Sequence, residues 1–422
     1  MNVEINLDKV RDKVIGNRPG ASYQYDVLIL DADYKQSLAC ARSLGRAGLR
    51  VVLGASSAEC SRPPRLPAFS SRYSARNVVL PSNSGDGAEF AAAVVKFVND
   101  NPTNVVLPTG DASIAALIPY RKELAELGCT LALAPDSALE IANDKDRTLQ
   151  VARDLRIDQP RSMRIDSIGD LTQVLAEFDF PFVLKPTISW TGQVPDRIAP
   201  VDVIDEAEAF DATQRFLAAG SAVLAQEWAS GRREGVTLFI DRGKVLASCG
   251  HVACRTSPPL GGASVMRQSI QTPPDTYSAA VRLVNAIGME GVCEVEFRRD
   301  AHNRPLLMEI NPRLAGTLEN AIQSGVDFPL MIWQWATGLT IGCVETHRIG
   351  VRTRWLRGDM YWLSHNLRLV DRPDTVSRVR ALWTFCAEFA RTRHYDYLDW
   401  RDIRPAVVEV RSMATCMSRK RR

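Results

Sequence analysis

Short apolar runs alternate with amphipathic stretches along the first third of the chain. The stretches Ser37–Ala47 and Glu89–Val98 carry apolar residues at helical spacing. Five apolar runs have the length of buried strands: Asp26–Leu30, Arg50–Gly54, Asn77–Pro81, Asn104–Pro108 and Thr130–Ala134. Strands that alternate with helices predict an open parallel sheet with right-handed crossovers. We therefore expect an α/β domain over residues 26–140, preceded by a polar N-terminal arm over residues 1–25.

The pattern changes after residue 140. Residues 141–225 centre on the apolar strand Pro181–Pro186, and residues 226–340 contain Gly235–Ile240, Lys244–Ser248 and a hairpin-like stretch, with the strand Leu224–Trp228 at the junction between the two. Residues 341–422 are rich in Arg and Trp and predict a helix near Val379–Arg391. We interpret these parts as a small lobe, a large lobe and a C-terminal extension. That extension either completes a substrate pocket or forms a dimer surface.

The most informative stretch is EVEFRRDAHNRPLLMEINPR, from Glu294 to Arg313. Two alternating segments flank a turn-prone stretch, and Pro305 is tolerated because it opens the second strand. A turn centred between His302 and Asn303 would place Glu296 opposite Glu309 and Glu294 opposite Asn311. Alternation then puts all four side chains on one face of the sheet.

Opposed acids of this kind suggest a bound cation. Like charges directly opposite each other destabilise a sheet unless a cation lies between them, and Mg²⁺ prefers one or two carboxylates together with phosphate oxygens. Glu296, Glu309 and Asn311 are therefore candidate ligands of Mg²⁺ or Mn²⁺, and Arg313 could reach an anionic oxygen of the same ligand. The alternative is a solvated strand face whose charges never meet.

Other residues suit a nucleoside triphosphate, which needs cations for its phosphates and a carboxylate for its ribose. Lys145 opens a helix in NDKDRT, where the helix end favours an anion. Lys185 follows the strand PFVLKP and would lie at a strand end facing a cleft. Glu227 or Glu234 could accept hydrogen bonds from the ribose, and the backbone of Trp228 and Ala229 could pair with an adenine edge. The alternatives are exposed lysines and an ordinary surface turn.

Composition narrows the class of protein. The 422 residues are 45% hydrophobic and 24% charged, as in ordinary globular proteins, and a net charge of +3 does not argue for nucleic acid or an acidic membrane. No apolar run approaches the length of a membrane span, and the N-terminus lacks the apolar core of a secretory signal. Nine scattered cysteines without a CxxC motif predict reduced thiols. We expect a cytoplasmic protein that acts on small molecules.

A dinucleotide-dependent oxidoreductase is the competing interpretation of the parallel sheet, since such sheets often hold NAD. The first strand–helix turn reads DADYKQS and has no glycine to let a pyrophosphate approach the backbone, which argues against it. The segment Thr109-Gly-Asp-Ala, at the end of a later strand, could line a ligand crevice or form a tight turn with a helix cap.

In this order the motifs resemble the ATP-grasp superfamily from about Asp26 to Leu339, most specifically in MEINPR and in GVDFPLMIWQWATG. The resemblance implies a Rossmann-like pre-ATP-grasp domain, a two-lobed α+β ATP-grasp domain and the C-terminal extension. It implies ATP between the lobes, with Lys145 and Lys185 on phosphates, Glu227 to Ala229 as the adenine strap, Glu234 on the ribose, Glu296, Glu309 and Asn311 on Mg²⁺, and Arg313 near the transferred phosphate. One departure is the loop KPTISWTGQVPDR, where the family has a glycine-rich loop and this chain has only Gly192.

The resemblance also implies an ATP-dependent carboxylate–amine ligase. A carboxylate attacks the γ-phosphate to give an acyl phosphate and ADP, and an amine then displaces phosphate. For the substrate carboxylate we expect Arg255 and Arg267, which flank SPPLGGASVM, because an arginine fork binds carboxylates bidentately. His251 could orient the substrate, act as a base or be structural. Two alternatives remain: an enzyme that forms carboxyphosphate or carbamoyl phosphate, and a nucleotide-binding regulator without catalysis. A homodimer is also left open.

Overall fold

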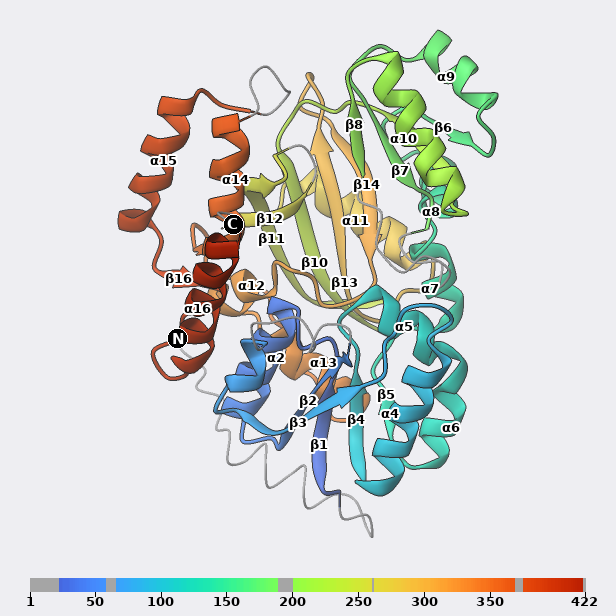
Figure 1. Cartoon of the computed structure of the whole chain (residues 1–422). Helices are drawn as coiled ribbons and strands as arrows, with labels where there is room; N and C mark the ends of the chain where they lie inside the picture. Colours follow the sequence, from blue (N-terminus) through green and yellow to red (C-terminus); the bar gives the residue numbers. More distant parts are fainter. Residues whose placement is uncertain (1–22, 58–65, 189–199, 260–261, 369–374, 420–422) are drawn as a thin grey trace.

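The computed structural model describes residues 23–57, 66–188, 200–259, 262–368 and 375–419. Within them the chain forms three sheets with helices packed around them (Figure 1). In this view the N-terminal sheet lies below a seven-stranded central sheet, a four-stranded sheet lies at the upper right, and the C-terminal helices stand at the left. The predicted α/β architecture is confirmed.

The N-terminal sheet is parallel throughout, as predicted, with strand order β3-β2-β1-β4-β5. Its strands are β1 (Tyr25–Ile29), β2 (Val51–Ser56), β3 (Ser74–Leu80), β4 (Thr103–Leu107) and β5 (Thr130–Leu131). The helical segments around it are α2 (Lys35–Arg46), η1 (Ala68–Ser70), α4 (Ala88–Asp100), α5 (Asp111–Leu117), η2 (Ile118–Tyr120), α6 (Arg121–Glu126) and α7 (Asp136–Ala142). Strands β1, β2 and β4 bury nearly every residue, because helices cover a parallel sheet on both faces. The order reverses between β1 and β4, so the crevice at their carboxyl ends is the expected place for a ligand.

The four-stranded sheet is antiparallel, with order β6-β9-β7-β8. Its elements are α8 (Lys145–Asp154), β6 (Ser162–Ile165), α9 (Asp170–Glu177), β7 (Phe182–Pro186), β8 (Val201–Val203), α10 (Glu206–Ala218) and β9 (Val223–Glu227). Asp144 caps α8 by accepting hydrogen bonds from the backbone N–H groups of Asp146 and Arg147 at 2.9 and 3.2 Å. The backbone N–H of Lys145 donates to the carbonyl of Thr187 at 2.9 Å, which fixes the start of α8 against the end of β7.

The central sheet has the order β14-β13-β10-β11-β12-β15-β16. Its strands are β10 (Arg233–Asp241), β11 (Lys244–Ser257), β12 (Ala263–Ile270), β13 (Gly291–Arg299), β14 (Pro305–Asn311), β15 (Arg352–Arg354) and β16 (His394–Tyr395). The helices packed on it or following it are α11 (Pro274–Ala286), α12 (Leu318–Ser324), α13 (Phe328–Ala336), α14 (Leu356–Arg368), α15 (Arg378–Arg391) and α16 (Arg404–Arg419). The C-terminal segment therefore contributes the last two strands of this sheet.

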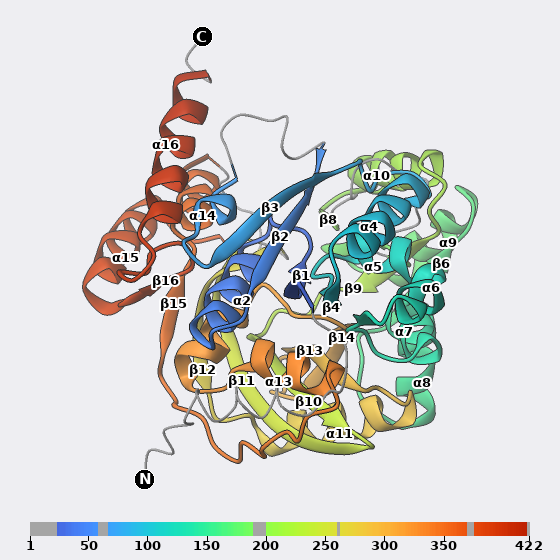
Figure 2. The ribbon, with the colours of Figure 1, turned by 90° about the horizontal axis from the view of Figure 1, so that it is seen from below.

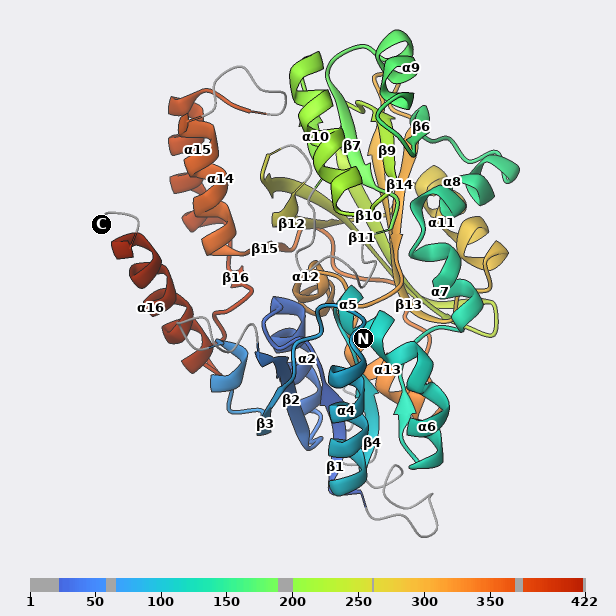
Figure 3. The same cartoon turned by 45° about the vertical axis from the view of Figure 1, so that its right-hand side comes forward.

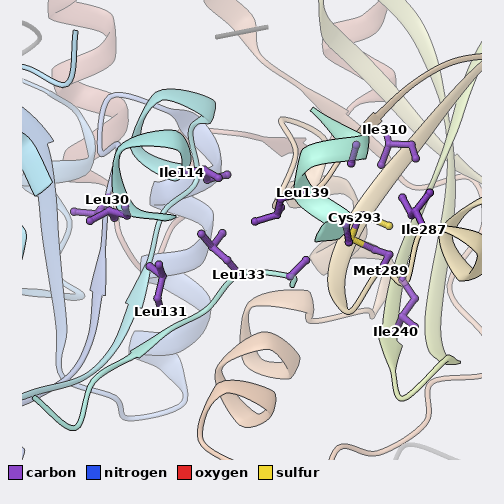
Figure 4. Close-up of a cluster of buried hydrophobic side chains, with 14 of the residues drawn as sticks. Leu30, Ile114, Leu131, Leu133, Leu139, Ile240, Ile287, Met289, Cys293 and Ile310 are labelled. Carbon is purple, nitrogen blue, oxygen red and sulfur yellow. The ribbon is translucent and has the colours of Figure 1, made fainter. Parts of the chain in front are cut away.

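A continuous apolar core joins the N-terminal sheet to the central sheet. In Figure 4, Leu30, Ile114, Leu131 and Leu133 come from the N-terminal side and Ile240, Cys293 and Ile310 from the central sheet, with Leu139 of α7 between them. These side chains belong to one buried cluster. Since the cluster includes residues of β13 and β14, it fixes the hairpin relative to the carboxyl ends of β1 and β4.

The C-terminal helices lie on the opposite side of the central sheet from the four-stranded sheet (Figures 2 and 3). Helix α14 packs against β11 and β12 and against α15. None of the helices in the described part of the chain is long and apolar enough to cross a membrane. Residues 1–22 of the predicted N-terminal arm and most of the segment KPTISWTGQVPDR lie outside the described residues, whereas Tyr25, placed in the arm, opens β1.

Candidate functional site

The hairpin of β13 and β14 has the predicted register. Glu296 pairs with Glu309 and Glu294 pairs with Asn311, and Pro305 opens the second strand. A bulge follows Glu296, so the two strands fall out of strict alternation only beyond the four side chains of interest. All four line one cavity of about 500 Å³.

Several separate parts of the chain meet at this cavity. Tyr34 and Lys35 follow β1, Asp111 opens α5, and Lys145 opens α8. The hairpin also lines it, as do residues of β10 and β11, of the segment after β14 and of the C-terminal extension, among them Arg233, His251, Arg313, Thr317, Trp355 and Tyr397. The cavity therefore lies where the crevice of the N-terminal sheet, the hairpin and the C-terminal segment face one another.

Cationic side chains of the chain itself lie beside the opposed acids. Arg233 donates to Glu296 Oε2 through Nε at 2.8 Å and also through Nη2. Lys145 Nζ lies 3.9 Å from Glu309 Oε2. Charges of both signs therefore alternate across this face, which explains how it tolerates two glutamates directly opposite each other.

Arg313 also faces the cavity, where it contacts the N-terminal domain. Its Nη2 lies 3.1 Å from Asp111 Oδ2 and 3.3 Å from Asn311 Oδ1. Gly110, just before Asp111, lets Tyr34 pack close to the backbone here, because a Cβ at this position would lie 2.8 Å from the Tyr34 ring. The segment Thr109-Gly-Asp-Ala thus lines the cavity, and its Gly110 at the N-cap of α5 offers no side-chain cap.

Burial shifts several pKa values at the site. Burial raises the pKa of Glu296 to about 7 against the opposing effect of Arg233, and Glu294 and Glu309 raise it further. Burial lowers the pKa of Lys185 to about 8, although the nearby Glu309 favours its charged form. Burial lowers the pKa of His251 to about 4, so its imidazole is neutral near pH 7. Its ring packs over Gly235, where a Cβ would lie 2.6 Å from Cε1.

The oxygen donors of this face suit a magnesium ion. Among the described residues, no group of three or more His, Cys, Asp and Glu side chains forms a metal site by itself. Mg²⁺ seldom uses such a group, since it takes one or two carboxylates and completes its octahedron with phosphate and water oxygens. Glu296, Glu309 and the amide oxygen of Asn311 are hard ligands on one wall of the cavity, so the residues present fit the ion.

The residues predicted to hold the rest of the nucleotide lie outside the cavity wall. Lys185 is buried and donates to Gln226 Oε1 at 2.7 Å and to the Met308 carbonyl at 3.5 Å. Glu227 is exposed, 4.0 Å from Arg161. Glu227, Trp228 and Ala229 connect β9 of the four-stranded sheet to β10 of the central sheet.

Trp228, Ala229 and Glu234 also have partners within the protein. Arg298 lies over the Trp228 ring at 4.8 Å and donates to the Ala229 carbonyl at 2.7 Å. Glu234 is buried, and it accepts hydrogen bonds from Arg299, Arg232 and Thr276. Strand alternation explains the position of Glu234, because Gly235 pairs with Glu296 and its neighbour therefore points to the opposite face.

The structure does not bring Arg255 and Arg267 into the cavity. Arg255 is buried, pairs with Asp359 at 2.9 Å and lies 4.1 Å from the Trp362 ring. Arg267 is fully buried, pairs with Asp396 and donates to Thr353 at 3.1 Å. Both guanidinium groups are therefore engaged by the C-terminal segment rather than directed at a ligand.

The sequence did not lead us to predict three sets of residues that line the cavity. Alternation from Glu234 would have placed Arg233 on the cavity face, because residues 233 and 235 share the side of Glu296. Lys35 lies in the turn DADYKQS, which follows β1 at the point where the strand order reverses. That position is itself a signal of a ligand site, but we judged the turn only by its lack of glycine. Trp355 and Tyr397 lie in the C-terminal segment, and nothing local in the sequence places them at the cavity.

Comparisons with known proteins find similarity to ATP-grasp proteins and to ligases. A family described as "ATP-grasp in the biosynthetic pathway with Ter operon" matches residues 251–358. The arginine-specific carbamoyl phosphate synthase large chain of Cutaneotrichosporon cutaneum is 25% identical over 54% of this chain and 20% of its own length. The D-alanine–D-alanine ligase of Pseudomonas entomophila is 26% identical over 46% of this chain and 64% of its own length.

A solved structure gives the same picture of the fold. The crystal structure of the L-amino acid ligase from Bacillus licheniformis superimposes with a TM-score of 0.56 at 18% identity, and the match covers 75% of each chain. At that identity the similarity concerns the fold. The chain spans less than two thirds of the two curated relatives, which leaves parts of those proteins without a counterpart here.

Proposed function

We propose that this chain, which is similar to ATP-grasp proteins and to ligases, is an ATP-grasp enzyme: an ATP-dependent ligase that joins a small carboxylate to an amine. The reaction would activate the carboxylate as an acyl phosphate and release ADP and phosphate. The observation that carries the proposal is the cavity face on which Glu296 opposes Glu309, beside Asn311 and Arg313. Its carboxylate and amide oxygens can bind a magnesium ion, and its arginine can bind the phosphates that the ion accompanies.

We assign the phosphate end of the cavity to Lys145, Arg313 and the hairpin. Glu296, Glu309 and Asn311 would hold Mg²⁺, which when bound neutralises charge on the phosphate oxygens. Lys145, fixed by the capped start of α8, would hold the phosphates in line with the attacking carboxylate. Arg313 would stabilise the negative charge that develops on the transferred phosphoryl group. Its contact with Asp111 orients the guanidinium.

The nucleotide base would lie against the segment Glu227–Ala229. This segment joins the two sheets of the proposed ATP-binding lobes, so a base held there would lie between them. The buried Lys185, behind the hairpin, would add positive charge near the phosphates. The hydrogen bonds that occupy Glu234 favour Glu227 over Glu234 as the acceptor of ribose hydroxyls.

We place the carboxylate substrate at the other end of the cavity, beside Lys35. Its Nζ donates to the Ser264 carbonyl at 3.2 Å, lies 3.6 Å from Asp396 and lies 5.3 Å from the Trp355 ring. An ammonium group has three N–H donors, so beside these contacts one donor remains for an anionic ligand. Trp355 and Tyr397 would form the walls of this end. Arg255 and Arg267 would then act indirectly, by fixing the C-terminal segment against β11 and β12.

The proposal is tested by measuring ADP and phosphate release from MgATP with pooled carboxylates, pooled amines, both pools, or bicarbonate. We expect both products in equal amounts only when a carboxylate and an amine are present together. Release that depends on bicarbonate would favour the formation of carboxyphosphate or carbamoyl phosphate. Tight ATP binding with no release in any mixture would replace the ligase with a nucleotide-binding regulator.

A further inference from the structure

Arg233 occupies the acidic face in a way that the ligase chemistry does not require. It opens β10 and lines the cavity, and its side chain is 20% exposed. Nε and Nη2 both donate to Glu296 Oε2, while Nη1 donates to the Gly262 carbonyl at 2.8 Å. The other oxygen of Glu296 accepts a hydrogen bond from Asn311 at 3.2 Å. Both oxygens of this carboxylate therefore already have partners.

A divalent ion bound at Glu296 Oε2 would have to displace this arginine. A metal ion and a guanidinium that donates twice to Oε2 need the same lone pairs of that oxygen, and two cations close to one oxygen repel each other. The charge of Arg233 also acts on Glu309 and Glu294. The arginine thus supplies the positive charge that the face needs when it holds no metal.

We propose that Arg233 is a stand-in cation, which holds Glu296 until a divalent ion binds and then turns to the phosphates of the nucleotide. The inference rests on the proposed function for the nucleotide, although the competition for Glu296 does not depend on which substrates are joined. Arginine suits this exchange because its planar fork fits a carboxylate and a phosphate equally well.

The test measures Mn²⁺ binding by electron paramagnetic resonance in the absence of nucleotide. Arg233→Met should bind Mn²⁺ about ten- to hundredfold more tightly than the parent, since the competing charge-assisted hydrogen bonds are gone. The same variant should bind ATP more weakly in the presence of saturating Mn²⁺. A rise in metal affinity together with a fall in nucleotide affinity would not arise from a merely structural arginine.

Two further variants control the measurement. Arg232→Met removes the neighbouring arginine, which contacts Glu234 on the other face, and should leave Mn²⁺ affinity unchanged. In the Glu296→Gln background, Arg233→Met should no longer raise the affinity, because the contested carboxylate is absent. Weaker or unchanged Mn²⁺ binding in a folded Arg233→Met protein would overturn the proposal. Tighter Mn²⁺ binding by Arg233→Met in a protein without ligase activity would support the role of Arg233 and count only against the proposed ligase function.

Discussion

Two clusters of paired acidic and basic side chains have different roles in this protein. At the hairpin, Glu296 and Glu309 contact Arg233 and Lys145 on the wall of a cavity. Where the C-terminal extension packs on β11, Asp359 of the extension is fully buried between Arg255 of β11 and Arg354. The first cluster can exchange its partners for a ligand, whereas the second has no access to one. Access to a cavity therefore distinguishes a binding site from a structural ion pair.

Replacing one hairpin carboxylate is the most direct test of whether the first cluster is a binding site. Glu309→Gln keeps the shape of the side chain but removes a proposed metal ligand, so kcat should fall at least about a thousandfold. The thermal midpoint should change little, because Lys145 keeps a polar neighbour. Activity is measured by ADP release, and folding by circular dichroism. Glu123→Gln on exposed α6 is the matched control. An active Glu309→Gln enzyme would remove the metal assignment.

The second cluster should respond in stability. Asp359→Ala would leave Arg255 and Arg354 buried without their counter-ion, and such a loss costs about 3–5 kcal/mol. We expect this decrease in the free energy of unfolding from denaturant titration. Asp100→Ala, which removes the exposed partner of Lys96, should leave stability nearly unchanged. If both variants were equally stable, the ion pairs of Asp359 would not be what holds the extension against β11.

The contrast also explains what the sequence could reveal. The hairpin register follows from alternation and a turn within about twenty residues, so local rules placed Glu296 opposite Glu309 correctly. The partners of Arg255 and Arg267 lie 104 and 129 residues away, in a segment whose pattern predicts helices but not their docking. Two arginines flanking a glycine-containing loop therefore suggested a carboxylate site, and the fold engages both elsewhere.

Replacing Lys35 should have a smaller effect, confined to the KM of the carboxylate substrate. Lys35→Met should raise the KM of the carboxylate about ten- to hundredfold, the range expected for a lost charge-assisted hydrogen bond. The KM of ATP should stay constant, since Lys35 contacts Ser264, Asp396 and Trp355 and none of the residues assigned to the phosphates. Lys122→Met, at an exposed position of α6, is the control. A parallel rise in both KM values would mean that Lys35 supports the cavity as a whole.

Lys35 should also give this end of the cavity a pH dependence near neutrality. Burial and the nearby Arg267 lower its pKa to about 7, against the opposing effects of Asp396 and Glu294. Its charge is therefore lost in the folded protein as the pH rises through 7, and affinity for the carboxylate should fall between pH 6 and 8. In Lys35→Arg the guanidinium stays protonated, so this fall should disappear while other pH effects remain. The measurement is kcat/KM for the carboxylate across that range in both proteins. Identical profiles would show that Lys35 does not carry the charge that the substrate meets.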